Sequence, residues 1–237
     1  MRILGVRIDN YPKDQIVRLI DDAISGSSPG QKFIVTLNPE IILKARANAE
    51  YKRILNSSDL NVCDGFGVKL VSFLKRDKIR ARIAGADLVD HTLKKAAGCG
   101  SEVLVIVRTD SLSRPEEIEK EVRDKYGMSI AAEYCGNGCE IKDSTAQRAE
   151  IVFVNFGAPE QESYIFNNKE KFPRAKILVG VGGTFDFITE KIRRAPKILR
   201  SIGLEWLWRL LQEPKRLRRI INAVVVFPII ALTSSKE

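Results

Sequence analysis

Short apolar runs alternate with stretches of helical periodicity along most of the 237-residue chain. Six β-branched-rich runs predict strands at Lys32–Thr36, Leu60–Cys63, Val103–Val107, Ser129–Glu133, Ile151–Asn155 and Lys176–Val181. Helical spacing and start signals predict helices at Pro39–Leu55, Gly67–Leu74, Ala86–Ala97, Pro115–Tyr126 and Pro159–Lys171. This alternation predicts an α/β fold with a mostly parallel sheet and helices on both of its faces. In such sheets, ligands bind at the turns beyond the carboxyl ends of the strands.

The pattern changes near Lys191, where the sequence becomes helical, basic and apolar together. The apolar run Ile221–Leu232 is too short to span a bilayer but suited to lying in its interface, with the neighbouring arginines at the headgroups. A helix packed on the core, with its arginines solvated, fits the composition equally well. We predict an α/β core over residues 1–191 and a basic amphipathic helical appendage over residues 192–237.

The net charge of +9 is concentrated in one segment. Lys191–Arg219 contains ten Lys and Arg residues against Glu205 and Glu213, a net charge of +8. Its partner is therefore expected to be anionic: phosphate groups, acidic lipid or nucleic acid. The apolar fraction of 44% and the charged fraction of 29% exclude a disordered protein.

The first residues show no secretory signal, and no apolar run is long enough for a spanning helix, so cytosolic residence is expected. Four cysteines do not make a disulfide scaffold in a chain of this size. Cys135-Gly-Asn-Gly-Cys139 can clip a turn or share a metal, but the single histidine, His91, is distant in sequence. Metal or redox function is the minor interpretation, and no cofactor is expected.

Polar side chains stand at the ends of the first two predicted strands. In "IVTLNPEI", Thr36 and Asn38 can hydrogen-bond a ligand, although helix capping alone accounts fully for Asn38. In "NVCDGFG", Asp64 follows a strand and precedes Gly65, which permits a tight turn and close approach of a substrate. Asp64 is therefore either a helix cap or a proton acceptor. Nearby Arg82 can pair with it, lower its pKa or hold a phosphate.

Glycine-rich turns follow the last two predicted strands. "VNFGAPEQE" places Gln161 in the first turn of a helix, and "ILVGVGGTFDF" runs a strand into Gly180, Gly182 and Gly183. Such turns let backbone N–H groups and a helix N-terminus approach phosphate closely. The glycines lack the full dinucleotide-binding spacing, and close packing of helix on strand explains them equally well.

Seven stretches together resemble the WecG/TagA/CpsF glycosyltransferases in order and spacing: "TLNPEI", "LNVCDGFGV", "RIAGADL", "FGAPEQE", "VGVGGTFD", "RRAP" and "GLEWLWRLLQEPKRLRR". The resemblance covers nearly the whole chain, from about Ile3. It implies a Rossmann-like core in a bacterial membrane-associated enzyme. It also implies inverting, metal-independent transfer of an N-acetylmannosamine-type sugar from a UDP donor to N-acetylglucosamine on undecaprenyl diphosphate. The product serves wall teichoic acid or a related surface polymer.

The resemblance assigns roles position by position. Asp64 matches the family's proposed general base, which favours the proton acceptor over the cap. Donor-pocket residues of the family match Thr36, Asn38, Arg82 and Gln161. The glycine turn, Gly182 and Gly183, is expected with Arg82 to stabilise the leaving UDP. Family arginines assigned to the acceptor's diphosphate have the spacing of Arg209, Arg216 and Arg219.

The expected partners are therefore a UDP-sugar, a lipid-linked acceptor and the anionic surface of a membrane. We expect the protein to lie in the cytoplasm, peripherally at the inner face of the cell membrane, and self-association is left open. A nucleic-acid-binding protein is the alternative from another class, but Trp206, Trp208 and the apolar tail argue against it. An inactive scaffold is a third interpretation, opposed by the retained site residues. Two departures from the family pattern, Val105–Thr109 and Cys135–Cys139, leave the identity of the donor sugar open.

Overall fold

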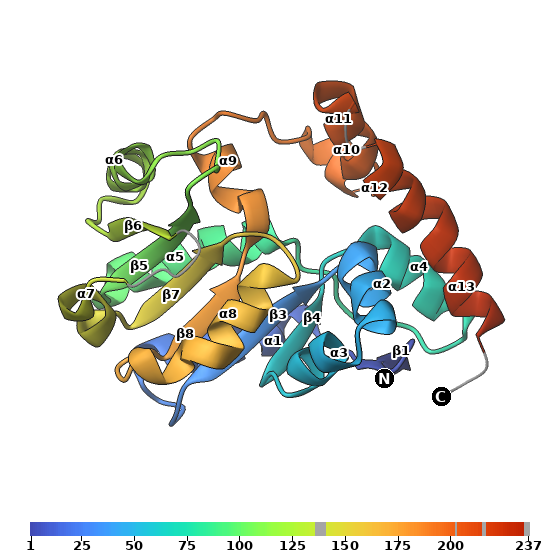
Figure 1. Ribbon diagram of the computed structural model, residues 1–237, viewed down its shortest axis with the longest axis horizontal. Helices are drawn as coiled ribbons and strands as arrows, with labels where there is room; N and C mark the ends of the chain where they lie inside the picture. Colours follow the sequence, from blue (N-terminus) through green and yellow to red (C-terminus); the bar gives the residue numbers. More distant parts are fainter. Residues whose placement is uncertain (136–140, 202, 215–216, 235–237) are drawn as a thin grey trace.

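The computed structural model describes residues 1–135, 141–201, 203–214 and 217–234. Six strands form one sheet in the order β4-β3-β8-β7-β5-β6 (Figure 1). Their bounds are β3 Lys32–Leu37, β4 Leu60–Cys63, β5 Val103–Arg108, β6 Ala131–Cys135, β7 Ile151–Asn155 and β8 Ile177–Gly180. All neighbouring pairs in this sheet are parallel, which confirms the predicted α/β fold.

Helices cover both faces of the sheet, and the strand residues divide between the two faces. In β5, Leu104 and Ile106 enter one apolar cluster, whereas Val103 and Val105 enter the other. The first cluster includes residues of α2 (Pro39–Ala47), α3 (Ala49–Asn56) and α8 (Glu160–Asn168). The second includes residues of α1 (Lys13–Ser25), α5 (Gly85–Cys99), α6 (Pro115–Tyr126) and α9 (Phe185–Ile188). Burial on both faces explains why the strands read as nearly continuous apolar runs.

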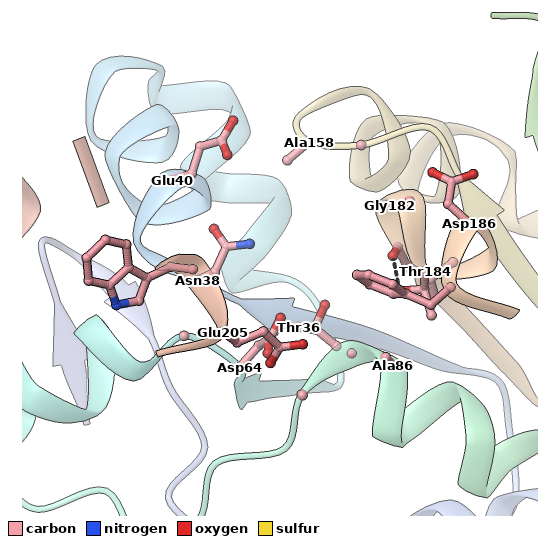
Figure 2. A pocket seen from close by; sticks show the side chains of 18 of the residues that line it. Thr36, Asn38, Glu40, Asp64, Ala86, Ala158, Gly182, Thr184, Asp186 and Glu205 are labelled. Atoms are coloured by element: carbon pink, nitrogen blue, oxygen red, sulfur yellow. Dashed lines mark hydrogen bonds between the residues drawn. The ribbon is translucent and has the colours of Figure 1, made fainter. Parts of the chain in front are cut away.

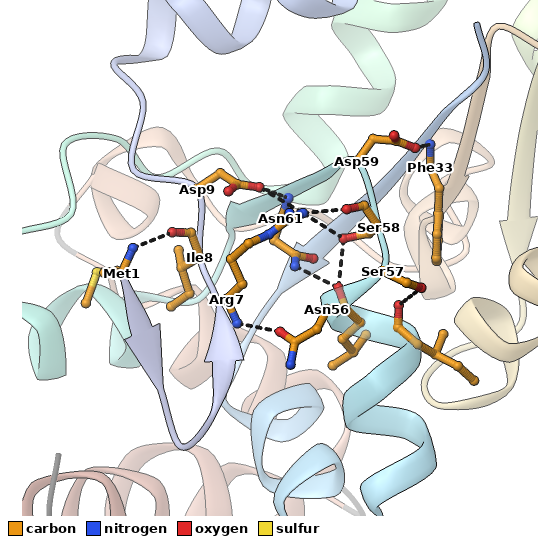
Figure 3. Close-up of polar contacts among 12 residues, drawn as sticks. Met1, Arg7, Ile8, Asp9, Phe33, Asn56, Ser57, Ser58, Asp59 and Asn61 are labelled. Carbon is orange, nitrogen blue, oxygen red and sulfur yellow. Dashed lines mark hydrogen bonds and ion pairs between the residues drawn. The ribbon is translucent and has the colours of Figure 1, made fainter. Parts of the chain in front are cut away.

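An N-terminal hairpin and the chain after it close the sheet edge at β4 (Figure 3). The hairpin pairs β1 (Arg2–Ile3) with β2 (Val6–Arg7) in antiparallel fashion. The Asp9 N–H then donates to the Asn61 carbonyl at 2.9 Å, and the Asp9 carboxylate accepts from the Asn61 N–H at 2.8 Å. The buried Asn61 amide donates to the Leu55 carbonyl at 2.8 Å. The two bonds between Asp9 and Asn61 satisfy backbone groups that an open edge strand would leave unpaired.

Several predicted elements have different bounds in the structure. The single helix predicted at Pro39–Leu55 is wrong, because Asn48 leaves the helical conformation and separates α2 from α3. The Asn48 side chain accepts from the Tyr51 N–H at 3.0 Å and so caps α3. The strand predicted at Ser129–Glu133 lies two residues later, at Ala131–Cys135.

Helices α1 and α7 (Asp143–Arg148) have no predicted counterpart, and the helix predicted from Pro159 begins one residue later, at Glu160. The signal for α1 was present in the sequence. Its buried residues have the spacing of an amphipathic helix: Ile16, Ile20, Ala23 and Ile24.

After α9 the chain forms helices along one side of the molecule (Figure 1). These C-terminal helices are α10 Lys197–Ser201, α11 Glu205–Gln212, α12 Leu217–Ile221, the π-helical η4 Asn222–Val226 and α13 Phe227–Thr233. Helix α13 packs against α2 and α4 (Phe66–Leu74), and Phe227 and Ala231 are buried there. In the described part of the chain, no helix has both the length and the apolar character to cross a bilayer.

Candidate active site

A cavity of about 630 Å³ opens at the carboxyl ends of the strands, within the usual size range of small-molecule sites. The turns after β3, β4, β5, β7 and β8 form one side of it, and residues of the C-terminal helices form the other (Figure 2). Eight predicted site residues line it: Thr36, Asn38, Asp64, Arg82, Gln161, Gly182, Gly183 and Arg219. The turns that carry candidate chemistry in the sequence thus meet in one place, as parallel α/β sheets dictate.

Thr36 and Asn38 lie where β3 turns into α2. Asn38 Oδ1 accepts from the Ile41 N–H at 3.0 Å, so Asn38 caps α2, and it also lines the cavity (Figure 2). Thr36 is largely buried, yet it also lines the cavity. A methyl group added at Gly85 would lie 3.6 Å from Thr36 Oγ1 and 3.8 Å from Asp64 Oδ2. The two oxygens therefore converge on the start of α5.

Asp64 does not cap the helix that follows it. Helix α4 begins at Phe66, its N-cap position is Gly65, and no side chain caps it. The Asp64 carboxylate instead lines the cavity and accepts a hydrogen bond from the Gly85 N–H. The Asp64 N–H donates to the Leu37 carbonyl at 2.9 Å, so pairing with β3 continues up to this turn and fixes its position.

The surroundings raise the pKa of Asp64 to about 7. Burial is the largest cause, and the negative charge of Glu205, the first residue of α11, adds to it. Arg82 and the Gly85 N–H act in the opposite direction. Arg82 thus favours the ionised carboxylate, as predicted, but it does not lower the pKa overall; its Nη2 donates to the Arg200 carbonyl at 3.0 Å. A carboxylate with a pKa near neutrality is well matched to accept a proton.

Gln161 holds the two glycine turns together. Its Oε1 accepts from the Gly157 N–H at 3.0 Å and from the Gly182 N–H at 2.8 Å. Its Nε2 donates to Glu162 at 2.6 Å, and the side chain is buried. A methyl group at Gly180 would collide with this side chain, which explains the glycine at the end of β8. The polar atoms of Gln161 therefore contact protein groups, and the residue positions the turn that lines the cavity.

Glu162 is a buried carboxyl that sequence reasoning did not single out. It accepts hydrogen bonds from the Tyr51 hydroxyl at 2.7 Å and from Gln161. Burial raises its pKa, although both hydrogen bonds favour the ionised form. A glutamate early in a helix is typical of a solvated first turn. Only its hydrogen bond with Tyr51 of α3 distinguishes Glu162 from such a solvated glutamate. That bond joins residues far apart in the sequence, so no local pattern indicates it.

Of the three arginines predicted to hold the acceptor's diphosphate, Arg219 is the one whose side-chain contacts the structure describes. It lines the cavity, and its Nη2 lies 2.7 Å from Glu40 Oε2. Lys44 pairs with the same carboxylate at 3.1 Å. Burial acts to raise the pKa of Glu40, but the hydrogen bonds and charges of Arg219 and Lys44 outweigh it and lower the pKa. The Arg209 side chain and all of Arg216 lie outside the described residues, so their roles stay predictions.

One departure from the family pattern borders the cavity. Arg108 ends β5, lines the cavity and donates from Nη2 to Asp110 Oδ2 at 2.7 Å. Within the described residues the cavity lining does not include Cys135, which ends β6. Residues 136–140 of the cysteine motif lie outside the description. Of the described residues in the two departures, Arg108 is the one that lines the cavity.

The fold and the cavity together define an α/β protein with a pocket of small-molecule size and a buried carboxyl group, Asp64, at the carboxyl edge of its parallel sheet. Comparison with known families identifies which one. Residues 1–237 match the Glycosyl transferase WecG/TagA/CpsF family, and the chain belongs to this family.

Two relatives have the same name, N-acetylglucosaminyldiphosphoundecaprenol N-acetyl-beta-D-mannosaminyltransferase. The protein from Bacillus spizizenii (strain W23) is 38% identical over 194 residues, which cover 80% of this chain and 75% of the relative. The protein from Staphylococcus aureus (strain MRSA252) is 31% identical over 224 residues, which cover 92% of this chain and 87% of the relative. The second similarity therefore spans nearly the full length of both chains.

Proposed function

We propose that this protein moves an N-acetylmannosamine-type sugar from a UDP donor to N-acetylglucosamine on undecaprenyl diphosphate, with inversion at the transferred carbon. Asp64 is the observation that carries the proposal, because it lines the cavity, does not cap the helix that follows it and has a pKa of about 7. The names of the two relatives support the choice of donor sugar and acceptor. The product is proposed to serve wall teichoic acid or another surface polysaccharide.

In this reaction Asp64 takes the proton of the attacking acceptor hydroxyl while that oxygen bonds to C1 of the donor sugar. The bond between C1 and the diphosphate oxygen breaks on the opposite face, and UDP leaves with the bonding electrons. Arg82 and the turn at Gly182 and Gly183 are proposed to stabilise the negative charge on the leaving UDP. The Gly182 N–H itself donates to Gln161, so the guanidinium and the other N–H groups of this turn are the proposed donors. They supply the stabilisation themselves, and we expect transfer to persist without added metal.

The acceptor's diphosphate is proposed to bind near Arg219, with Arg209 and Arg216 completing the set. Arg219 is now paired with Glu40 beside the cavity. A diphosphate carries more negative charge than one carboxylate and offers more acceptor oxygens for a guanidinium. Binding of the acceptor would therefore exchange one anionic partner of Arg219 for a stronger one.

The test uses wild-type protein and Asp64→Asn with UDP-N-acetylmannosamine, a short-chain analogue of the lipid acceptor, and EDTA. We expect disaccharide from the wild type and a loss of roughly 10²-fold or more in the variant. The kcat/KM of the wild type should rise with pH through about 7, because only the ionised form of Asp64 accepts a proton. Equal turnover by both proteins would exclude Asp64 as the base, and thermal unfolding controls for misfolding of the variant.

We also propose that α4 and the neighbouring C-terminal helices form one membrane-facing surface. The C-terminal helices expose apolar side chains at near-helical spacing: Leu217, Ile221, Val225, Ile229 and Leu232. Helix α4, against which α13 packs, exposes Leu70, Phe73 and Leu74. Basic residues accompany α4, namely Lys69, Lys75, Arg76 and Lys78. Apolar side chains rimmed by cations suit the interface of an anionic bilayer, which supports peripheral association of the enzyme with the inner face of the cell membrane.

Nucleic acid is the less favoured partner. Arg194 and Arg200 pair with Asp87 of α5, and Arg219 pairs with Glu40. These contacts direct basic residues of the C-terminal segment towards core carboxylates, whereas a nucleic-acid site presents its cations to solvent along a groove.

A further inference from the structure

Three charged residues lie in the family-like stretches but have no role so far: Asp87 in "RIAGADL", Arg194 in "RRAP" and Glu205 in "GLEWL". The structure brings them together. Arg194 Nη2 lies 2.7 Å from Asp87 Oδ1, and Arg194 Nε lies 3.8 Å from Glu205 Oε1. Arg200 Nη1 lies 3.6 Å from the same Asp87 oxygen. These ion pairs connect the start of α5 to α10 and α11 beside the cavity.

The connection brings a second carboxylate towards Asp64. Glu205 is the first residue of α11, and both it and Asp64 line the cavity. In Figure 2 the two carboxylates are drawn in the same part of the cavity, with Thr36 near them. The charge of Glu205 acts on Asp64 more strongly than any other charge does. A helix N-terminus is a favourable place for a carboxylate, so α11 itself supports Glu205 in this position.

We propose that Glu205 is a positioning residue for sugar transfer, which makes Asp64 a stronger base when the C-terminal helices cover the cavity. The proposal rests on the proposed function, in which Asp64 is the base. A carboxylate beside Asp64 opposes its ionisation and so increases its affinity for a proton. Without α11 over the cavity, Asp64 would lack both this charge and part of its burial. The base therefore has its full strength only with α11 in the position that the structure shows.

The other groups around Asp64 do not replace Glu205. Arg82 and the Gly85 N–H both favour the ionised form, and they belong to the core. Asp87 opposes ionisation, but less than Glu205 does. The neighbouring Cys63 thiol has its own pKa raised to about 12, by burial first and by Asp64 next, so it is uncharged near neutrality. Glu205 is thus the strongest anionic influence on Asp64, and it comes from the segment that covers the cavity.

The test compares Glu205→Gln with the wild type over pH 5 to 9, in the same disaccharide assay. We expect the acid limb of kcat/KM to move down by roughly one pH unit, because Asp64 ionises more easily without Glu205. We also expect activity at pH 8 to fall by about threefold, because a weaker base accepts the proton less readily. Glu205→Asp keeps the charge and should retain most of the wild-type profile. Glu116→Gln removes an exposed carboxylate from α6 and should change nothing.

A second measurement needs no substrate, so it separates this proposal from the proposed function. Carbon-13 NMR of labelled aspartate, with the Asp64 signal assigned by its absence in Asp64→Asn, follows the titration of that carboxyl directly. We expect a pKa of about 7 in the wild type and a lower one in Glu205→Gln. An ordinary aspartate value in the wild type, or no change in the variant, would overturn the role of Glu205. So would a uniform loss of activity at every pH, which indicates that Glu205 only holds α11 in place.

Discussion

The contact between the first two turns of the cavity depends on one glycine. A methyl group at Gly65 would collide with Pro39 and would lie 3.2 Å from the Asn38 Cα. The turn that holds Asp64 therefore touches the turn that caps α2, and any larger residue would force them apart. Gly65 at this point makes the close approach possible and keeps Asp64 beside Thr36.

At the same scale, the buried pair of Tyr51 and Glu162 gives a pH-dependent prediction. Tyr51→Phe removes one donor from a buried carboxyl and should lower the free energy of unfolding by about 1–3 kcal/mol. The folded-state pKa of Glu162 is already above its ordinary value, and losing the donor raises it further. An acid with a raised folded pKa favours folding most at low pH, and that stability is lost as pH rises towards the folded value. The loss should therefore be larger at pH 8 than at pH 5.

Urea unfolding at the two pH values measures this loss. Tyr126→Phe is the matched control, because the Tyr126 hydroxyl donates to Asp90 at 2.9 Å in a more exposed place. Its loss should be smaller. Equal losses in the two variants, or a Tyr51→Phe loss that is the same at both pH values, would contradict the assignment of Glu162.

At the scale of elements, α4 and η4 pack closely at Gly67. A methyl group there would lie 3.0 Å from Pro39 Cγ and 3.1 Å from the Ala223 carbonyl oxygen. Gly67→Val should therefore separate the C-terminal helices from the core, at a cost of about 1–3 kcal/mol for overpacking. We expect trypsin to cleave after residue 190 about tenfold faster or more, and transfer activity to fall.

Gly98→Val is the control for this element, because nothing lies within 4 Å of a methyl group at Gly98 in α5. Gly98→Val therefore introduces the same valine side chain into a helix at a position where it displaces no neighbouring element. If both variants are cleaved at the wild-type rate while Gly67→Val folds normally, the contact of α4 with η4 does not hold the C-terminal helices.

Elements that depend on local patterns could be predicted from the sequence, and contacts between distant segments could not. The strands and the glycine turns follow from periodicity and turn chemistry, and the parallel sheet then places Thr36, Asp64 and Gly182 at one edge. The single helix at Pro39–Leu55 failed because the capping side chain of Asn48 outweighed the continuous helical pattern. Glu205 could not be found either, since its position depends on where α11 returns to the core.

At the scale of the whole molecule, the proposed membrane face joins the core to the C-terminal helices, so each side can be tested separately. Phe73 on α4 and Ile229 on α13 are each 57% exposed. Phe73→Glu and Ile229→Glu should each weaken binding to phosphatidylglycerol vesicles by about tenfold, because each removes apolar area that the interface buries. Leu19→Glu on α1, on the opposite face of the sheet from α2, should bind like the wild type.

Sedimentation with vesicles, at low and high salt, measures this binding and distinguishes the contributions of charge and apolar surface. Salt should weaken wild-type binding, because the lysines and arginines beside α4 are exposed to solvent and screened. If Phe73→Glu binds vesicles as strongly as the wild type, the membrane-facing surface is limited to the C-terminal helices. A change in oligomer size without a change in vesicle binding would assign the same surface to a second copy of the chain. Weakened binding by both variants would mean that the membrane contacts α4 and α13 together. Because α4 directly follows Asp64, the bilayer would then orient the catalytic turn towards its lipid-linked substrate.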